Sequence, residues 1–203
     1  MYVYISLYGV IMNVFDFDGT IYSGDSTIDF YFFALKRNVK LLLFLPRQCL
    51  GVILYKLGFI SKTQMKEQFF IFLKGIDEID KLIDDFWANY KVKIEKWYFD
   101  IHRDDDVVIS ASPEFLLAPV CRILGIRALI ASKVNKSNGI FYEENCYGKE
   151  KVRYFLKKYP NSVIDKFYSD SKSDIYMARL ANQAYLIKKH KMVLWKVRAK
   201  DMV

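Results

Sequence analysis

The sequence predicts an α/β fold, in which helices flank a parallel sheet and an α-helical domain is inserted after the first strand. Two observations indicate this class. Short apolar runs that end in Asp or Ser alternate with helical patterns after residue 100, and one such run stands near the N-terminus. Between residues 22 and 104 there is no convincing strand pattern, and long helical periodicities replace it. We therefore expect a sheet domain of residues 1–22 and 101–203 and a helical domain of residues 23–100.

Five apolar runs predict the strands of this sheet. They cover residues 14–17, 107–109, 128–130, 162–168 and 184–187. Helical patterns over residues 113–124, 149–158 and 174–182 separate the later runs, as in a doubly wound sheet. Ligands of such sheets bind beyond the carboxyl ends of the strands, so the polar residues that follow each run are the candidates for a site.

The inserted domain is expected to consist of helices. Helical patterns cover residues 26–37, 41–57, 62–73 and 76–96. The third of them begins at Ser61-Lys62-Thr63-Gln64, which is typical of a capping box. Later in the chain, residues 135–147 contain Ser-Asn-Gly and predict a small β-hairpin or flap.

Composition narrows the classes of protein. The chain of 203 residues is 53% hydrophobic, which is enough to bury a core. Its cysteines, Cys49, Cys121 and Cys146, form neither a disulfide framework nor a zinc motif, so we expect reduced thiols in a cytoplasmic protein. The net charge of +8 favours anionic partners such as phosphate esters, although scattered surface lysines explain it equally well.

The N-terminal 15 residues carry no charge, yet they lack the basic region and the cleavage site of a signal peptide. They are also too short to span a bilayer. Met12 stands directly before the first predicted strand. Residues 1–11 are therefore either an upstream extension or an addition to the sheet.

The first candidate motif is Asp16-Phe17-Asp18-Gly19-Thr20, directly at the end of the first strand. Acids at positions i and i+2 of a strand point to the same face. Gly19 allows the backbone to turn sharply after them. A plain turn with capping acids would have the same pattern, so this motif alone does not establish a site.

Two further motifs follow later strands. Ser110 ends the run 107–109, and Ala111-Ser112-Pro113 then begin a helix, whose N-terminus is suited to bind an anion. An ordinary helix-capping serine is the alternative. Lys149 and Lys151 stand at the start of another helix, where the helix dipole disfavours a cation. Either lysine could meet a phosphate there, or both could be solvated.

The last motif is Asp170 and Asp174 after strand 162–168, and either a metal ligand or a helix cap is plausible for Asp174. With Asp16 and Asp18, these acids would gather at one edge of the sheet. Carboxylates so close repel one another unless they are protonated or paired with a cation. Oxygen ligands favour a hard ion, and Mg²⁺ with retained waters fits best.

These four ordered motifs resemble those of the haloacid dehalogenase-like hydrolase superfamily, in the subfamily IB branch that includes phosphoserine phosphatase. The resemblance covers nearly the whole chain and implies a Rossmann-like core with a helical cap domain. It implies that Asp16 is the nucleophile, phosphorylated during turnover, and that Asp18 is the general acid and base. Ser110 and Lys151 would bind the phosphoryl group; the branch's Gly-x-x-Lys pattern falls on Gly148 to Lys151 rather than on Lys149.

The resemblance also implies a metal site and a substrate site. Mg²⁺ would be held by the carboxylates of Asp16 and Asp170 and by the backbone carbonyl of Asp18, with Asp174 orienting these groups. Further residues are expected at the substrate: Asp25, Gly19, Thr20, Ala111 and Ser112.

The residues expected around the substrate differ from those of phosphoserine phosphatase. Asp25 stands where phosphoserine phosphatase has a longer acid, and Phe69 stands where that enzyme has a cap arginine. The only basic residues near Phe69 are Lys66 and Lys74. An apolar cap is poorly suited to a small zwitterion, which makes phosphoserine itself a less favoured substrate, and we expect a small phosphorylated metabolite.

An alternative comes from residues 39–59, VKLLLFLPRQCLGVILYKLGF, which resemble the cap of bacterial phosphatidylglycerophosphate phosphatases. This resemblance implies a lipid head-group phosphate as substrate and a peripheral place at the inner face of the membrane. The basic tail over residues 188–200 would suit an anionic surface. We expect instead that the apolar residues pack against one another and the core. A nucleic-acid-binding module has no motif here, so nucleic acid is not an expected partner, and the oligomeric state is not predicted.

Overall fold

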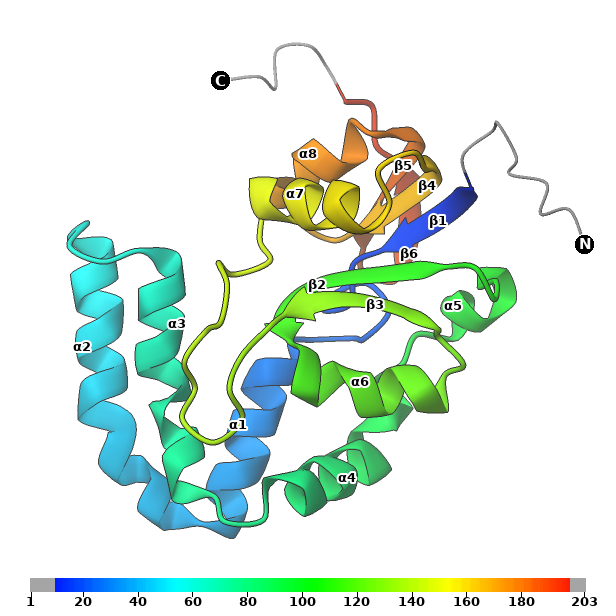
Figure 1. Ribbon diagram of the computed structural model, residues 1–203. Helices are drawn as coiled ribbons and strands as arrows, with labels where there is room; N and C mark the ends of the chain where they lie inside the picture. Colours follow the sequence, from blue (N-terminus) through cyan, green and yellow to red (C-terminus); the bar gives the residue numbers. More distant parts are fainter. Residues whose placement is uncertain (1–9, 198–203) are drawn as a thin grey trace, which may run out of the picture.

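The computed structural model describes residues 10–197 and shows the expected α/β fold (Figure 1). Its sheet has the strand order β3-β2-β1-β4-β5-β6. The strands are β1 (Ile11–Phe15), β2 (Val107–Pro113), β3 (Ala128–Ser132), β4 (Val163–Ser169), β5 (Ala181–Lys188) and β6 (Lys191–Leu194). The first five are parallel, and β6 is antiparallel to β5.

The central strand β1 determines where the site lies. Phe15 pairs with Val108 of β2 on one side and with Tyr168 of β4 on the other. All three side chains are buried, because a parallel sheet covered on both faces needs apolar residues throughout. Asp16 and Asp170 directly follow β1 and β4, and Ser110 lies in the carboxyl half of β2, so all three lie toward the same edge of the sheet.

Helices cover both faces of the sheet. On one face α6 (Glu114–Ile123) buries Leu117 against Phe15 and Val108. On the other face α7 (Lys149–Lys158) and the short α8 (Ile175–Ala178) bury Phe155 and Met177 against alternate residues of the strands. Strand-end residues thus emerge between two packed layers.

The helical cap domain occupies the chain between β1 and β2. It consists of α1 (Ser26–Arg37), α2 (Leu45–Lys56), α3 (Lys62–Phe70), α4 (Ile79–Tyr90) and α5 (Lys96–Ile101), with 3-10 turns at Val39–Phe44, Ile71–Gly75 and Lys91–Lys93. Figure 1 shows α2 and α3 side by side as the helix pair farthest from β5 and β6. The predicted capping box is present, since Ser61 and Gln64 bond each other's backbone N–H.

Two predicted helices are divided. The helix expected over residues 41–57 begins instead at Leu45, because Pro46 suits a first turn and not a helix interior. The helix expected over residues 76–96 ends at Tyr90, because the chain must return to the core, where Glu95 N–H donates to the Ile21 carbonyl at 2.8 Å.

The C-terminal region also differs from the expectation. The helix predicted over residues 174–182 is only α8, since β5 begins at Ala181. A sixth strand was not predicted; Lys189 and His190 have positive φ of 46° and 64° and form the tight turn that joins β5 to β6. Within residues 135–147 the expected flap contains no strand, and a single bridge joins Val134 to Phe141.

The role of the N-terminal extension is only partly tested. Ile11 and Met12 belong to β1 and pair with Val163 and Ile164 of β4, so the strand begins earlier than residue 14. Residues 1–9 lie outside the described residues, as do Arg198 and Lys200 of the basic tail.

Candidate active site

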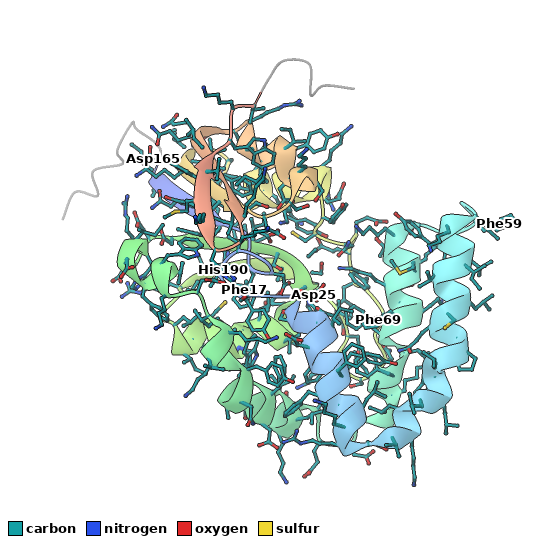
Figure 2. All side chains as sticks on the ribbon, turned by 180° about the vertical axis from the view of Figure 1, so that it is seen from behind. Phe17, Asp25, Phe59, Phe69, Asp165 and His190 are labelled. Atoms are coloured by element: carbon teal, nitrogen blue, oxygen red, sulfur yellow. The ribbon has the colours of Figure 1, made fainter. Side chains whose placement is uncertain are left out.

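A cavity of about 760 Å³ lies between the carboxyl edge of the sheet and the cap. The core side of its wall brings together most of the predicted site residues: Asp16, Asp18, Gly19, Ser110, Ala111, Ser112, Lys151, Asp170 and Asp174. The cap side comes from α1, α2 and α3. Figure 2 shows Asp25 at the start of α1 and Phe69 on α3, and both line the cavity.

Lys151 links two buried aspartates at the floor of this cavity. Its Nζ donates to Asp16 Oδ1 at 2.8 Å and to Asp174 Oδ2 at 2.7 Å. Burial alone would lower the pKa of Lys151, but the two carboxylates outweigh it and raise that pKa, so the lysine is a cation. Burial raises the pKa of Asp16 to about 8, although the charge of Lys151 opposes this effect. The lysine therefore favours the carboxylate form of Asp16 without restoring its ordinary pKa.

Lys149, the alternative lysine, has a different place. Its Nζ lies 5.1 Å from the ring centroid of Tyr176, on the outside of α7. Lys151 is 2% exposed and points inward from the same helix. The structure thus brings only Lys151 of this pair to the aspartates.

Asp18 is held between the core and the cap. Its Oδ1 accepts the backbone N–H of Ser26 at 2.7 Å, at the start of α1, and its Oδ2 accepts the hydroxyl of Ser112. Burial and the nearby charge of Asp25 raise the pKa of Asp18, while these hydrogen bonds lower it. A carboxyl group with a raised pKa is suited to give and take a proton near neutral pH.

Ser110 and Ser112 line the next part of the wall. The hydroxyl oxygen of Ser110 accepts the backbone N–H of Ser112 at 3.1 Å, and no group within residues 10–197 accepts the proton of this hydroxyl. That O–H is therefore free to donate to an anion. Ser112 also shares a hydrogen bond with Thr27 of α1 at 2.9 Å, which ties this loop to the cap.

Asp170 packs directly against the turn that follows Asp16. Gly19 has φ +68°, and a Cβ built there would lie 2.2 Å from Asp170 Oδ2. Only glycine leaves room for the carboxylate at that point. Partial burial and the charge of Asp174 raise the pKa of Asp170. The turn and the Asp170 carboxylate therefore form one cradle of oxygen atoms beside Asp16.

We expect Gly19→Ala to disrupt this cradle. A Cβ at residue 19 displaces the Asp170 carboxylate and also adds the strain of a positive φ, about 1–2 kcal/mol. Gly58→Ala is the matched control, because Gly58 has φ +79° and open space around its missing Cβ. In thermal unfolding, the loss of stability for Gly58→Ala should be no larger than the backbone strain explains. The loss of stability for Gly19→Ala should be clearly larger. Equal losses in both variants would contradict the close contact with Asp170.

Two predicted substrate contacts have other partners in the structure. Thr20 is fully buried and does not line the cavity; its hydroxyl oxygen accepts the backbone N–H of Asp170 at 3.0 Å. Thr20 therefore joins the ends of β1 and β4 and does not reach a substrate, which corrects the expectation. Asp25 does line the cavity, but its carboxylate also caps α1 by accepting the N–H of Ile28 at 3.0 Å.

The oxygen cradle fits a magnesium ion. Within residues 10–197, no three acidic, His or Cys side chains converge on one point, so protein carboxylates alone would not enclose an ion. The predicted set needs only the Asp16 and Asp170 carboxylates, one backbone carbonyl and water, which is typical of Mg²⁺. Burial is the main cause of the raised pKa values of Asp16, Asp18 and Asp170, and neighbouring aspartates add to it, so a bound cation would favour the charged form of all three. In addition, Asp174 Oδ1 is buried with no hydrogen-bond partner among the described residues.

Sequence reasoning missed most of the cap side of the cavity. Lys66 of α3 donates to the Ala111 carbonyl at 2.8 Å and to Asn145 Oδ1 at 3.0 Å. Lys62, one turn earlier, lies 3.1 Å from the ring centroid of Tyr147. Their spacing of four residues on one helix was the available signal, since it places both on one face.

Comparisons with known proteins agree with this architecture. The profile of the haloacid dehalogenase-like hydrolases matches residues 14–179. No curated protein sequence matches the chain. A structure described as a protein with unknown function from Bordetella pertussis Tohama I is 19% identical, with a TM-score of 0.66 over 87% of this chain and 89% of that one. A phosphoserine phosphohydrolase-like protein from Francisella tularensis is 18% identical, with a TM-score of 0.57 over 90% and 88%.

A third structure, a probable phosphoserine phosphatase from Vibrio cholerae, is 11% identical, with a TM-score of 0.57 over 86% of this chain and 55% of that one. At such identities the likeness to solved structures establishes the fold and leaves the substrate open.

Proposed function

The chain belongs to the haloacid dehalogenase-like hydrolases, and from this premise we propose that it is a magnesium-dependent phosphomonoester hydrolase similar to phosphoserine phosphatases. One observation carries the proposal. Asp16 lines the cavity between the sheet and the cap with Lys151 Nζ at 2.8 Å from its Oδ1, while Asp18, Ser110 and Asp170 line the same wall. A carboxyl group whose charged form a lysine favours, beside an acid and a set of anion-binding groups, is suited to transfer a phosphoryl group through a covalent intermediate.

Asp16 and Asp18 divide the chemistry between them. A carboxylate oxygen of Asp16 forms a bond to phosphorus as the ester O–P bond breaks, and Asp18 gives its proton to the leaving alkoxide. In the second step Asp18 takes a proton from water, and the water oxygen attacks phosphorus. The bond between phosphorus and Asp16 then breaks, which releases phosphate and restores the free carboxylate.

Lys151 and Ser110 stabilise the phosphoryl group during both steps. Lys151 brings a positive charge next to Asp16, and the Ser110 hydroxyl offers a hydrogen-bond donor from β2. Fixed donors and cations of this kind stabilise charge that grows on the phosphoryl oxygens in the transition state. Asp174 holds Lys151 in place through its 2.7 Å bond.

The metal ion has a limited and specific part. Asp16, Asp170 and the carbonyl of Asp18 would hold Mg²⁺, and the bound ion would neutralise negative charge as the phosphoryl group approaches Asp16. Burial, and to a smaller extent the charge of Asp174, raise the pKa values of Asp16 and Asp170, and a cation there would favour their carboxylate forms.

A lipid-type phosphate is the second candidate for the substrate. The cap side of the cavity wall is largely apolar, with Ile28, Val52, Met65, Phe69 and Phe70, and it carries Lys62 and Lys66 as cations. Such a wall favours an apolar body with a further anionic group over a small zwitterion like phosphoserine. The cap side of the wall therefore favours a substrate such as a lysophospholipid-type phosphate or another phosphorylated metabolite with an apolar part.

The proposal predicts hydrolysis of p-nitrophenyl phosphate by the purified protein in the presence of Mg²⁺. Release of nitrophenol should stop on addition of EDTA and return with excess Mg²⁺, because the acidic cradle then regains its cation. A panel that contains phosphoserine and lysophosphatidate separates the two substrate candidates. Turnover that EDTA leaves unchanged would contradict the magnesium requirement, and no turnover of any panel member would contradict the phosphatase assignment.

A further inference from the structure

The outward surface of the cap carries a continuous apolar face, which we call the α2 face. It consists of exposed side chains from the 3-10 turn before α2, from α2 itself and from the loop after it: Leu42, Leu43, Leu45, Leu50, Ile53, Leu57 and Phe59. Leu43 is 81% exposed and Phe59 is 73% exposed. Figure 2 shows Phe59 at the tip of the α2–α3 pair, pointing away from the rest of the protein. The expectation that these apolar residues pack against the core is wrong.

Helix α2 is built with its polar side inward. Its buried residues are Gln48 and Gly51. Gln48 accepts a hydrogen bond from the Tyr31 hydroxyl at 2.7 Å and donates to the Phe69 carbonyl at 2.8 Å. Gly51 packs closely on Gln68 of α3, where a Cβ would lie 2.5 Å from the Gln68 Cβ. A surface helix in water normally turns its leucines inward, so the inverted arrangement indicates an apolar surface outside the protein.

The chain segment that forms the α2 face carries only positive charges. The sequence contains no Asp or Glu between Asp29 and Glu67. Lys40, Arg47 and Lys56 lie beside the apolar side chains and are exposed. Arg47 bonds the neutral Gln68 at 2.7 Å, and no ion pair engages Lys40 or Lys56 within the part of the chain that the structure describes. An apolar strip whose own segment carries three exposed cations and no acid complements an anionic lipid surface, which is apolar inside and negative at its headgroups.

We propose that the α2 face docks the protein peripherally on an anionic membrane. Its leucines and Phe59 would enter the boundary between headgroups and acyl chains, while Lys40 and Lys56 meet the acidic headgroups. No helix within residues 10–197 is long and apolar enough to cross a membrane, so the contact lies in the interface. The same helix supplies Val52 to the cavity wall, which brings the mouth of the cavity near the lipid. This docking does not depend on phosphatase activity.

Co-sedimentation of the full chain with vesicles tests the proposal without any turnover. The probes are vesicles of phosphatidylcholine alone and of phosphatidylcholine with phosphatidylglycerol. We expect binding to the anionic vesicles that salt weakens. Leu50→Ser with Ile53→Ser should weaken binding at least about tenfold, because two inserted apolar side chains are lost. Lys40→Gln with Lys56→Gln should weaken it by roughly fivefold per lysine at low salt.

Matched controls keep the test specific. Val92→Ser with Ile123→Ser removes two exposed apolar side chains outside the α2 face, and Lys157→Gln with Lys191→Gln removes two exposed charges outside it. Both control pairs should bind like the unchanged protein, and circular dichroism melting should verify that every variant folds. Three results would overturn the proposal: no binding, equal binding to neutral and anionic vesicles, or a lipid-free dimer that only the Leu50→Ser and Ile53→Ser pair dissociates.

Discussion

Replacing Asp16 by Asn is expected to lower the turnover of a phosphomonoester at least about a thousandfold. The amide has the shape of the carboxylate but is a poor nucleophile, so the first O–P bond does not form. The fold should survive, because Lys151 keeps its bond to Asp174 at 2.7 Å. Steady-state kinetics with p-nitrophenyl phosphate, together with a melting curve, measures both effects.

Asp165→Asn is the matched control for this loss. Asp165 lies on β4, the strand that leads to Asp170, but near its beginning. Figure 2 shows it far from Asp25, and Asp165 does not line the cavity. Its replacement should leave turnover unchanged. Unimpaired turnover in Asp16→Asn would show that another group accepts the phosphoryl group.

Replacing Lys151 by Met is expected to remove activity and also to destabilise the fold by about 3–5 kcal/mol. In the unchanged protein Lys151 Nζ lies 2.8 Å from Asp16 Oδ1 and 2.7 Å from Asp174 Oδ2. The variant leaves both aspartates buried without this shared cation. Asp174 keeps the Ser169 hydroxyl at 2.8 Å from its Oδ2, but this neutral donor does not replace the lost charge, and Asp174 Oδ1 lacks a partner among the described residues. Denaturant unfolding in the absence of substrate measures this cost directly.

The destabilisation should depend on pH. Without Lys151, the influence that lowers the pKa of Asp16 is lost, and burial raises that pKa further above its value in the unfolded chain. A carboxyl with a raised folded-state pKa costs stability at high pH, and this cost disappears as the pH falls through that pKa. The variant should therefore approach the stability of the unchanged protein as the pH falls toward the ordinary aspartate pKa of about 4.

Lys149→Met, two residues earlier on the same helix, is the control for Lys151. Its ammonium group lies over Tyr176 at the surface, so its removal should change the free energy of unfolding by less than about 1 kcal/mol at every pH. A cost for Lys151→Met that is small, or that grows as the pH falls, would contradict the ion-pair account.

The parallel strands were predictable because both of their faces are buried. Residues such as Val14, Phe15, Val108 and Ile109 must all be apolar, and a short apolar run is the result. Strand β6 gave no such signal, since all of its residues are exposed. The ends of α4 and α8 depend on where distant segments of the chain pair. The local hydrophobic periodicity carries no information about such pairing.

Within the candidate site, the places of the motif residues along the sequence predicted which residues gather, but not where each side chain points. Acids at strand ends gather because parallel strands share an edge, so Asp16, Asp18 and Asp170 were placed together correctly. The direction of the Thr20 hydroxyl depends on the loop after β4, and the sequence did not reveal it. The exposure of the α2 face could not be predicted either. The sequence of this leucine-rich helix does not show whether Gln48 or the leucines face the core.

The central claim is that Asp16 carries the phosphoryl group, and trapping that group tests it most directly. The protein would be mixed with a ³²P-labelled phosphomonoester and Mg²⁺, quenched in acid within a single turnover, digested and sequenced by mass spectrometry. Our account predicts label on the peptide that contains Asp16, lost in Asp16→Asn and retained in Asp165→Asn. Turnover without protein-bound label, or label on a residue other than Asp16, would contradict it.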